Sequence, residues 1–171
     1  MPLAYSGAGS PLLLALAYPA LEHDFAVQTA VLVGAPFFDV DTNLKAGSLK
    51  RIVNIYGSDD LGLRTSGSLP HIAKKFTHSE HSFETINIEL KDIHHVEYFY
   101  QNGENPTPEQ KKASSFIARL TQAALDSAEL ERVLVKFNAT LQEQTYVDPN
   151  TNISHHIRTY IIDTKNIPDN L

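Results

Sequence analysis

Ser6, Asp60 and His95 are three polar residues, each placed just after a short apolar run of the kind that forms strands. A serine hydroxyl near its free pKa is a weak nucleophile and needs a base within hydrogen-bond reach. Histidine suits that role because its pKa lies near neutrality. A carboxylate beside it fixes the imidazole tautomer and stabilises the imidazolium. The three residues therefore predict attack on a carbonyl through a covalent acyl intermediate.

Each of these assignments has a simpler or neighbouring alternative. Asp59 directly precedes Asp60, and His94 directly precedes His95. Aspartate commonly stabilises turns, and a serine near the start of a chain can be an ordinary loop residue. We therefore keep Asp59 and His94 as alternatives for the acid and the base.

The segments that must position these residues alternate between strands and helices. Ser10-Pro11 and Thr107-Pro108-Glu109-Gln110 pair a capping residue with proline, as helix starts do. The first helix should run toward Leu21 and the second to about Ser127. Apolar runs typical of buried parallel strands cover 3–5, 26–33, 52–56 and 83–90. Because loops at the carboxyl ends of parallel strands meet, this α/β pattern predicts that the three residues come together.

The end of the chain has a different pattern. Residues 132–147 and 155–163 alternate apolar and polar side chains, and Asp148-Pro149-Asn150-Thr151-Asn152 forms a turn signal between them. This pattern predicts a β-hairpin. We therefore expect a core over residues 1–128 and a hairpin extension over 129–171, packed on the core or on a partner.

Four motifs resemble those of the α/β-hydrolase family, in its lipase- and esterase-like members. Tyr5-Ser6-Gly7-Ala8-Gly9 resembles the nucleophile elbow, a tight turn from strand to helix. Val31-Leu32-Val33-Gly34-Ala35-Pro36 is similar to the next strand of such proteins. Gly57-Ser58-Asp59-Asp60 resembles the Gly-x-x-Asp that supplies the acid. Ile93-His94-His95-Val96-Glu97-Tyr98-Phe99 resembles the histidine loop.

The resemblance covers roughly residues 3–127 and implies a truncated α/β-hydrolase-like parallel sheet with a hairpin extension. It implies that Ser6 is the nucleophile, Asp60 the acid and His95 the base of a carboxylic ester hydrolase. The backbone amide of Gly7 would then donate to the oxyanion. No cofactor is implied.

Two departures from the family pattern matter. Ala4 and Ala8 stand where the elbow usually has glycine. The second oxyanion amide of the family comes from a loop before the elbow strand, which this sequence does not contain. We therefore weigh three hypotheses: a fragment of a larger hydrolase, a non-catalytic scaffold, or a minimal hydrolase. A minimal hydrolase would form a homo-oligomer, or fold its hairpin at 131–163 back, to cover the sheet edge exposed beside the elbow strand.

The sequence indicates the substrate pocket less clearly than the catalytic residues. Tyr5, Phe37 and Phe38 are candidates for a substrate pocket, although aromatic residues are equally common in cores. The resemblance implies a small-molecule or lipid ester as substrate.

Composition excludes other classes of function. The formal net charge is -6 with scattered basic residues, which disfavours nucleic-acid binding. There is no cysteine, and neither His78-Ser79-Glu80-His81 nor His155-His156 has the spacing of a zinc protease, so we expect no metal site. Residues 11–20 resemble a signal-peptide core, but no basic residue precedes them. The compartment stays open, with the cytoplasm favoured.

Overall fold

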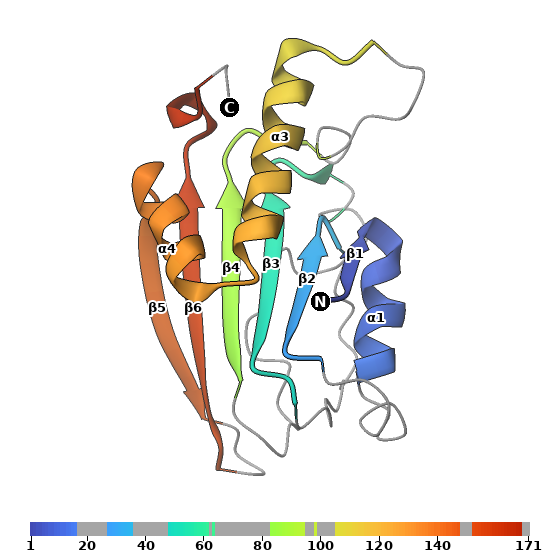
Figure 1. Ribbon diagram of the computed structural model, residues 1–171, viewed down its shortest axis with the longest axis vertical. Helices are drawn as coiled ribbons and strands as arrows, with labels where there is room; N and C mark the ends of the chain where they lie inside the picture. The colour runs from blue at the N-terminus through green and yellow to red at the C-terminus, as the bar shows by residue number, and fades with distance from the viewer. Residues whose placement is uncertain are drawn as a thin grey trace.

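In the described part of the chain, six strands form a mixed sheet (Figure 1). The computed structural model describes residues 1–16, 27–35, 48–61, 63, 83–94, 98, 105–147 and 152–168. The strand order is β1-β2-β3-β4-β6-β5; all neighbours are parallel except β5, which is antiparallel to β6. The strands are β1 (Leu3–Tyr5), β2 (Thr29–Val33), β3 (Arg51–Gly57), β4 (Glu84–Leu90), β5 (Thr140–Val147) and β6 (Ser154–Ile162).

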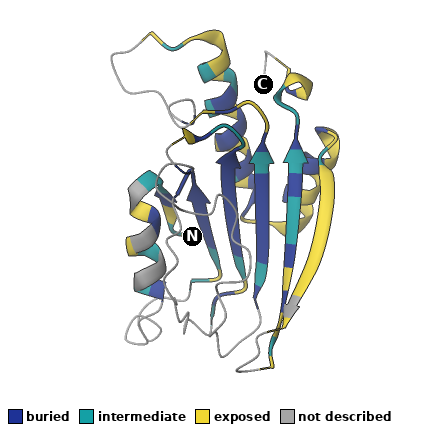
Figure 2. Ribbon diagram, turned by 180° about the vertical axis from the view of Figure 1, so that it is seen from behind, coloured by how far each residue is buried: buried dark blue, intermediate teal, exposed yellow. Residues whose placement is uncertain are grey.

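The described helices cover the two faces of this sheet unequally (Figure 1 and Figure 2). Helices α3 (Pro108–Ala123) and α4 (Ser127–Lys136) lie on one face (Figure 1), and α1 (Gly9–Leu16) lies beside β1 and β2. Successive side chains of a strand point to opposite faces of the sheet, so each face has its own hydrophobic core. Val53 belongs to the cluster that includes α3 and α4, whereas Ile52 packs in the cluster with Leu16 of α1. The predicted α/β class with a mainly parallel sheet is therefore confirmed.

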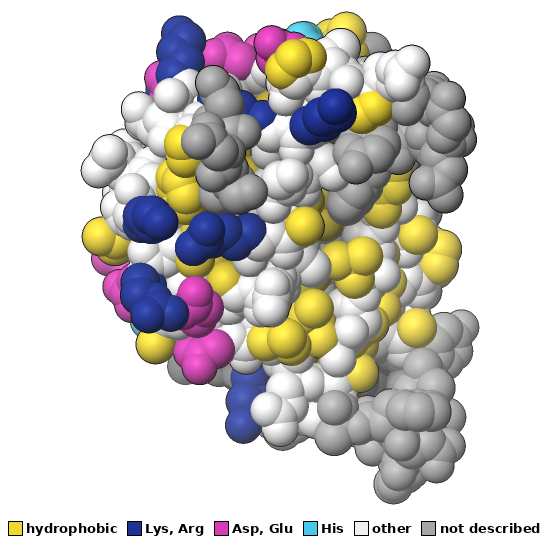
Figure 3. Space-filling view, turned by 45° about the horizontal axis from the view of Figure 1, so that its top comes forward, with side chains coloured by type: hydrophobic (Ala, Val, Ile, Leu, Met, Phe, Trp, Pro, Cys, Tyr) yellow, Lys and Arg dark blue, Asp and Glu magenta, His cyan; other side chains and the backbone are white. Residues whose placement is uncertain are grey.

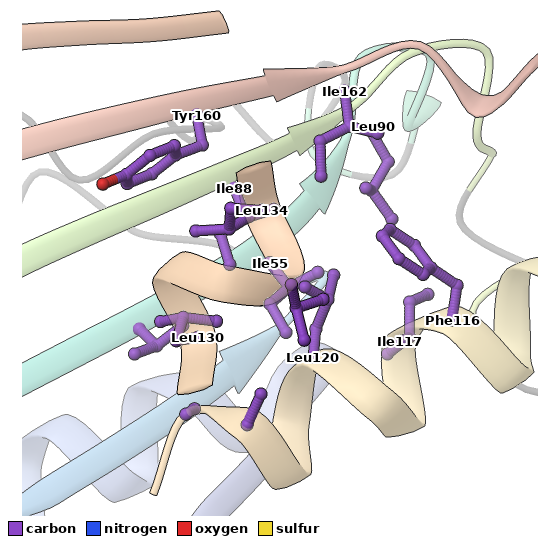
Figure 4. Packing of buried hydrophobic residues seen from close by; sticks show 14 of the residues in the cluster. Ile55, Ile88, Leu90, Phe116, Ile117, Leu120, Leu130, Leu134, Tyr160 and Ile162 are labelled. Carbon is purple, nitrogen blue, oxygen red and sulfur yellow. The ribbon is translucent and has the colours of Figure 1, made fainter. Parts of the chain in front are cut away.

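The larger core lies between the sheet and α3 and α4 (Figure 4). Ile55 and Ile88 from neighbouring strands face Leu120 of α3 and Leu134 of α4, and all four are at most 1% exposed. Burying a side chain of this size is worth about 1.5–3 kcal/mol. This packing holds β3 and β4 in place, and the loops that follow these two strands carry Asp60 and the histidine pair.

The second predicted helix begins as expected but ends early. Thr107 and Gln110 form a reciprocal capping box at its start, as the local sequence predicted. The helix ends at Ala123, and Asp126 then caps α4 by accepting hydrogen bonds from the amides of Ala128 and Glu129. The prediction that residues 132–136 belong to a strand is therefore wrong.

The physical reason is the spacing of apolar residues in this segment. Leu130, Val133, Leu134 and Phe137 are all buried against the core, at intervals of three, four and seven residues. Residues at these intervals lie on one face of a helix. The run Val133-Leu134-Val135-Lys136-Phe137 also contains a short alternation, which the sequence-based prediction took for strand.

The hairpin does form from β5 and β6, but it joins the sheet at the opposite edge from the one expected. β6 pairs in parallel with β4 over seven residues, from Glu84 opposite His156 to Leu90 opposite Ile162. The expectation that the hairpin folds back over the edge beside β1 is therefore wrong. β1 offers only three residues for pairing, whereas β4 offers a seven-residue edge, so more backbone hydrogen bonds form at β4.

Candidate active site at the carboxyl ends of the parallel strands

Ser6 lies at a sharp turn between β1 and α1. It opens a single 3-10 turn, Ser6–Ala8, which leads directly into α1. Its φ of 50° lies in the left-handed region, which residues other than glycine adopt at a cost. Such backbone strain persists only where the surrounding structure holds it, and it clusters at functional sites. A serine at the turn between a strand and a helix is the arrangement that the expected nucleophile elbow requires.

Close packing at the start of α1 accompanies this turn. A Cβ placed on Gly9 would lie 2.5 Å from the Cβ of Ala35, just past the end of β2. Since real Cβ atoms do not approach so closely, glycine is what lets the start of α1 meet the end of β2. Gly7, the expected oxyanion donor, lies within the 3-10 turn directly after Ser6.

Asp60 is the buried member of the aspartate pair that follows β3. It is 1% exposed, and each of its carboxylate oxygens has a hydrogen-bond donor. The Leu63 amide donates to Oδ1 at 3.0 Å, and the Tyr98 hydroxyl donates to Oδ2 at 2.8 Å. Asp59 is only partly buried. The structure thus distinguishes an oriented, desolvated carboxylate at Asp60 from a more solvated one at Asp59.

Tyr98 connects the ends of three strands. Its hydroxyl accepts a hydrogen bond from the Gly57 amide at the end of β3 while donating to Asp60. Its ring occupies the space beside Gly34, where a Cβ would lie 2.3 Å from Cε2. It also packs edge-on against Tyr5 at the end of β1, with ring centroids 6.1 Å apart. Sequence reasoning missed this role, although Tyr98 lies within the motif taken for the histidine loop.

Electrostatics in this cluster favour the neutral form of both tyrosines. Burial raises the pKa of the Tyr98 hydroxyl, and the negative charge of Asp60 raises it further, although the Gly57 amide acts in the opposite direction. Burial and the Asp60 charge also raise the pKa of Tyr5. Asp60 therefore interacts electrostatically with Tyr5, the residue directly before Ser6.

The loops that follow β3 and β4 are tied together. The Asp92 amide donates to Ser58 Oγ at 3.1 Å, and the Ser58 amide donates to the Leu90 carbonyl at 2.9 Å. At Gly57 a Cβ would lie 2.1 Å from the carbonyl oxygen of Ile93, so glycine is required for the backbones to approach. The chain that leads to the histidine pair is thus anchored against the loop that carries Asp60.

The histidine pair is only partly described. His94 is exposed, and its Nδ1 lies 3.0 Å from the Asp59 carbonyl oxygen. His95, Phe37 and Phe38 lie outside the described residues. The structure therefore brings Tyr5, which directly precedes Ser6, and Asp60 against the same Tyr98 side chain. It does not test the expected base or the two phenylalanines of the expected pocket.

A separate cavity lies at the other end of the strands. It has a volume of about 510 Å³ and is lined partly by Glu84, His156 and Arg158, at the amino ends of β4 and β6. Glu84 there forms ion pairs with both Arg51 and Arg158. Ligands of open α/β sheets bind at the carboxyl ends of the strands, so we place the candidate site at Ser6 and Asp60 rather than in this cavity.

Other classes of site were searched in the described part of the chain. There, no group of three or more His, Asp or Glu side chains could hold a metal ion, and no helix is long and apolar enough to cross a membrane. Figure 3 brings the carboxyl ends of the parallel strands toward the viewer and shows cationic and anionic side chains interspersed. Comparison of the chain with protein families, curated proteins and solved structures found no match.

Proposed function

We propose that this protein is a serine hydrolase that cleaves carboxylic esters through an acyl-enzyme intermediate. The observation that carries the proposal is the left-handed conformation of Ser6 at the turn from β1 to α1. It is supported by Asp60, a buried carboxylate oriented on both oxygens, past the end of the same parallel sheet. The proposal is further supported by the strand order β1-β2-β3-β4, because the segments that follow β1, β3 and β4 all leave the sheet at the carboxyl ends of parallel strands.

In the proposed mechanism Ser6 Oγ attacks the ester carbonyl while His95 accepts the hydroxyl proton. The resulting oxyanion accepts a hydrogen bond from the Gly7 amide. His95 then donates its proton to the alkoxide that leaves as alcohol, which yields the acyl-enzyme. Water repeats the sequence: His95 takes a proton from it, the carbonyl is attacked, and Ser6 leaves with the proton restored.

Asp60 would orient His95 and stabilise the imidazolium that forms in each step. A carboxylate oxygen has two lone pairs and can accept more than one hydrogen bond, so the bonds from Leu63 and Tyr98 do not by themselves prevent a bond from His95. Tyr98 is then a positioning residue that holds the carboxylate without contacting substrate. Tyr5, half-buried beside it, is the described candidate for the wall of a substrate pocket.

Hydrolysis of p-nitrophenyl acetate, butyrate and octanoate by the purified chain tests this proposal. We expect turnover that Ser6→Ala removes and that Ser127→Ala leaves unchanged, since Ser127 is an exposed serine at the start of α4. Turnover that persists in Ser6→Ala would contradict the proposal. Lack of turnover on all three esters, with a folded chain, would favour the alternative of a scaffold without activity.

A further inference from the structure

β5 presents a long unpaired strand edge. One side of β5 pairs with β6 over eight residues, and its other side meets no strand among the described residues. Residues 140–145 and Val147 are all exposed, as Figure 2 shows along the outer strand. Such an edge displays unsatisfied backbone donors and acceptors that pair readily with another strand.

Natural edge strands are usually protected by short length, lysine, proline or a bulge. β5 is eight residues long, contains neither lysine nor proline, and carries a single charge at Glu143. It also exposes two large apolar side chains, Leu141 at 44% and Val147 at 49%. β1, at the opposite edge of the sheet, is only three residues long. Of the two edge strands, β5 is therefore the one better suited to pair with a strand of another chain.

Symmetry limits how two copies of β5 can pair. Two identical edge strands related by a two-fold axis perpendicular to the sheet run antiparallel, and each side chain stays on its own face. Directly opposite residues must also point to the same face of the joined sheet. Because side chains alternate between faces, one residue must lie directly opposite its own copy, and the axis passes midway between these two copies. We call this an axis through that residue. Axes through Glu143 and through Gln144 both give an overlap of seven residues within the strand bounds.

These two registers differ in the pairs that they create. An axis through Glu143 places the two Glu143 carboxylates directly opposite each other, which is destabilising. An axis through Gln144 places Leu141 opposite Val147, so the two exposed apolar side chains of each copy cover one another. It also places Glu143 opposite the neutral Thr145. The sequence of β5 is thus self-complementary about Gln144.

We propose that the chain forms a homodimer in which two β5 strands pair antiparallel about Gln144, joining two six-stranded sheets into one of twelve strands. The dimer does not depend on the proposed hydrolase activity. Since β5 and β1 are opposite edges of the sheet, Ser6 of each copy lies away from the interface. A contact of one strand pair is small, so the dimer is concentration-dependent.

Cysteine cross-linking tests the register directly, because the chain has no cysteine and any disulfide is intermolecular. In the proposed dimer the two copies of residue 144 are directly opposite, with Cα atoms about 4.5–5.5 Å apart, within the range that a disulfide spans. The two copies of residue 142 are offset by four residues, about 14 Å along the strands. We expect Gln144→Cys to form covalent dimer at least about tenfold faster than Gln142→Cys, its exposed same-face control.

A charge swap provides a second measurement that does not rely on oxidation. In the proposed register, position 145 of one copy faces Glu143 of the other, so Thr145→Lys should tighten the dimer and Thr145→Glu should weaken it in sedimentation equilibrium. Equal cross-linking at 142 and 144, or the same dissociation constant for both Thr145 variants, would overturn the register. A wild-type chain that stays monomeric at high micromolar concentration would overturn the dimer. The β5 edge would then be a candidate for pairing with a different protein.

Discussion

The Tyr98 hydroxyl is a single group whose removal tests the network behind the candidate site. Tyr98→Phe keeps the ring against Gly34 and Tyr5, so the packing is preserved. It removes the acceptor of the buried Gly57 amide and a donor to the Asp60 carboxylate. A buried amide without a partner costs about 1–3 kcal/mol, and a hydrogen bond to a charged group is worth about 1.5–3 kcal/mol. Because the two terms overlap, we expect a loss of about 2–4 kcal/mol in the free energy of unfolding.

Urea denaturation followed by circular dichroism measures this loss, since the chain has no tryptophan. Tyr160→Phe is a matched control, because Tyr160 is also buried and its hydroxyl accepts one hydrogen bond from Arg158. Arg158 keeps its ion pair with Glu84, and its side chain is 25% exposed, so water can replace the lost hydroxyl. No buried group is left without a partner, so the control should cost less than a bond to a buried charge, about 0.5–1.5 kcal/mol. Equal losses in the two variants would refute the network as a stabilising unit at the end of the sheet.

Three further predictions follow from the same residues. Asp60→Asn should lower kcat for ester hydrolysis by about 10⁴-fold, whereas Asp59→Asn, measured under the same steady-state conditions, should change it by only a few-fold. Gly34→Ala should lower the unfolding free energy by more than about 1 kcal/mol in urea denaturation, because its φ is +52° and its Cβ would overlap Tyr98. Burial raises the pKa of Tyr98, so above pH 10 the unfolded chain releases this proton while the folded chain keeps it. Stability should then fall with rising pH, and Tyr98→Phe should make that fall shallower by about 1.4 kcal/mol per pH unit; an unchanged slope in denaturation at pH 9–11.5 would contradict this assignment.

Local patterns predicted the elements well because their causes are local. The capping box of Thr107 and Gln110 involves residues three positions apart, and it starts a helix as expected. The aspartate cap and apolar spacing of α4 are equally local, but they overlap a short alternation that favoured a strand. The choice of sheet edge for the hairpin could not be predicted in this way. It depends on how many residues β4 and β1 can offer, and that number emerges only when the whole sheet is assembled.

In the candidate site, too, features with local causes could be predicted and features that depend on distant residues could not. The spacing of Gly57 and Asp60 favoured Asp60 over Asp59, and the structure buries Asp60 and orients both of its oxygens. Tyr98 was missed because its partners lie far away in sequence: Gly57 is 41 residues and Asp60 38 residues away. The signal that was available is the glycine at position 34, whose lack of a side chain makes room for an aromatic ring.

Labelling with a fluorophosphonate probe, followed by peptide mass spectrometry, tests the central claim most directly. An activated serine reacts with such a probe, whereas an ordinary hydroxyl does not. We expect stoichiometric modification of Ser6 that is lost in His95→Ala and retained in His94→Ala. Lack of modification at Ser6 in the folded wild-type chain, or modification that is unchanged in His95→Ala, would contradict the proposed serine hydrolase.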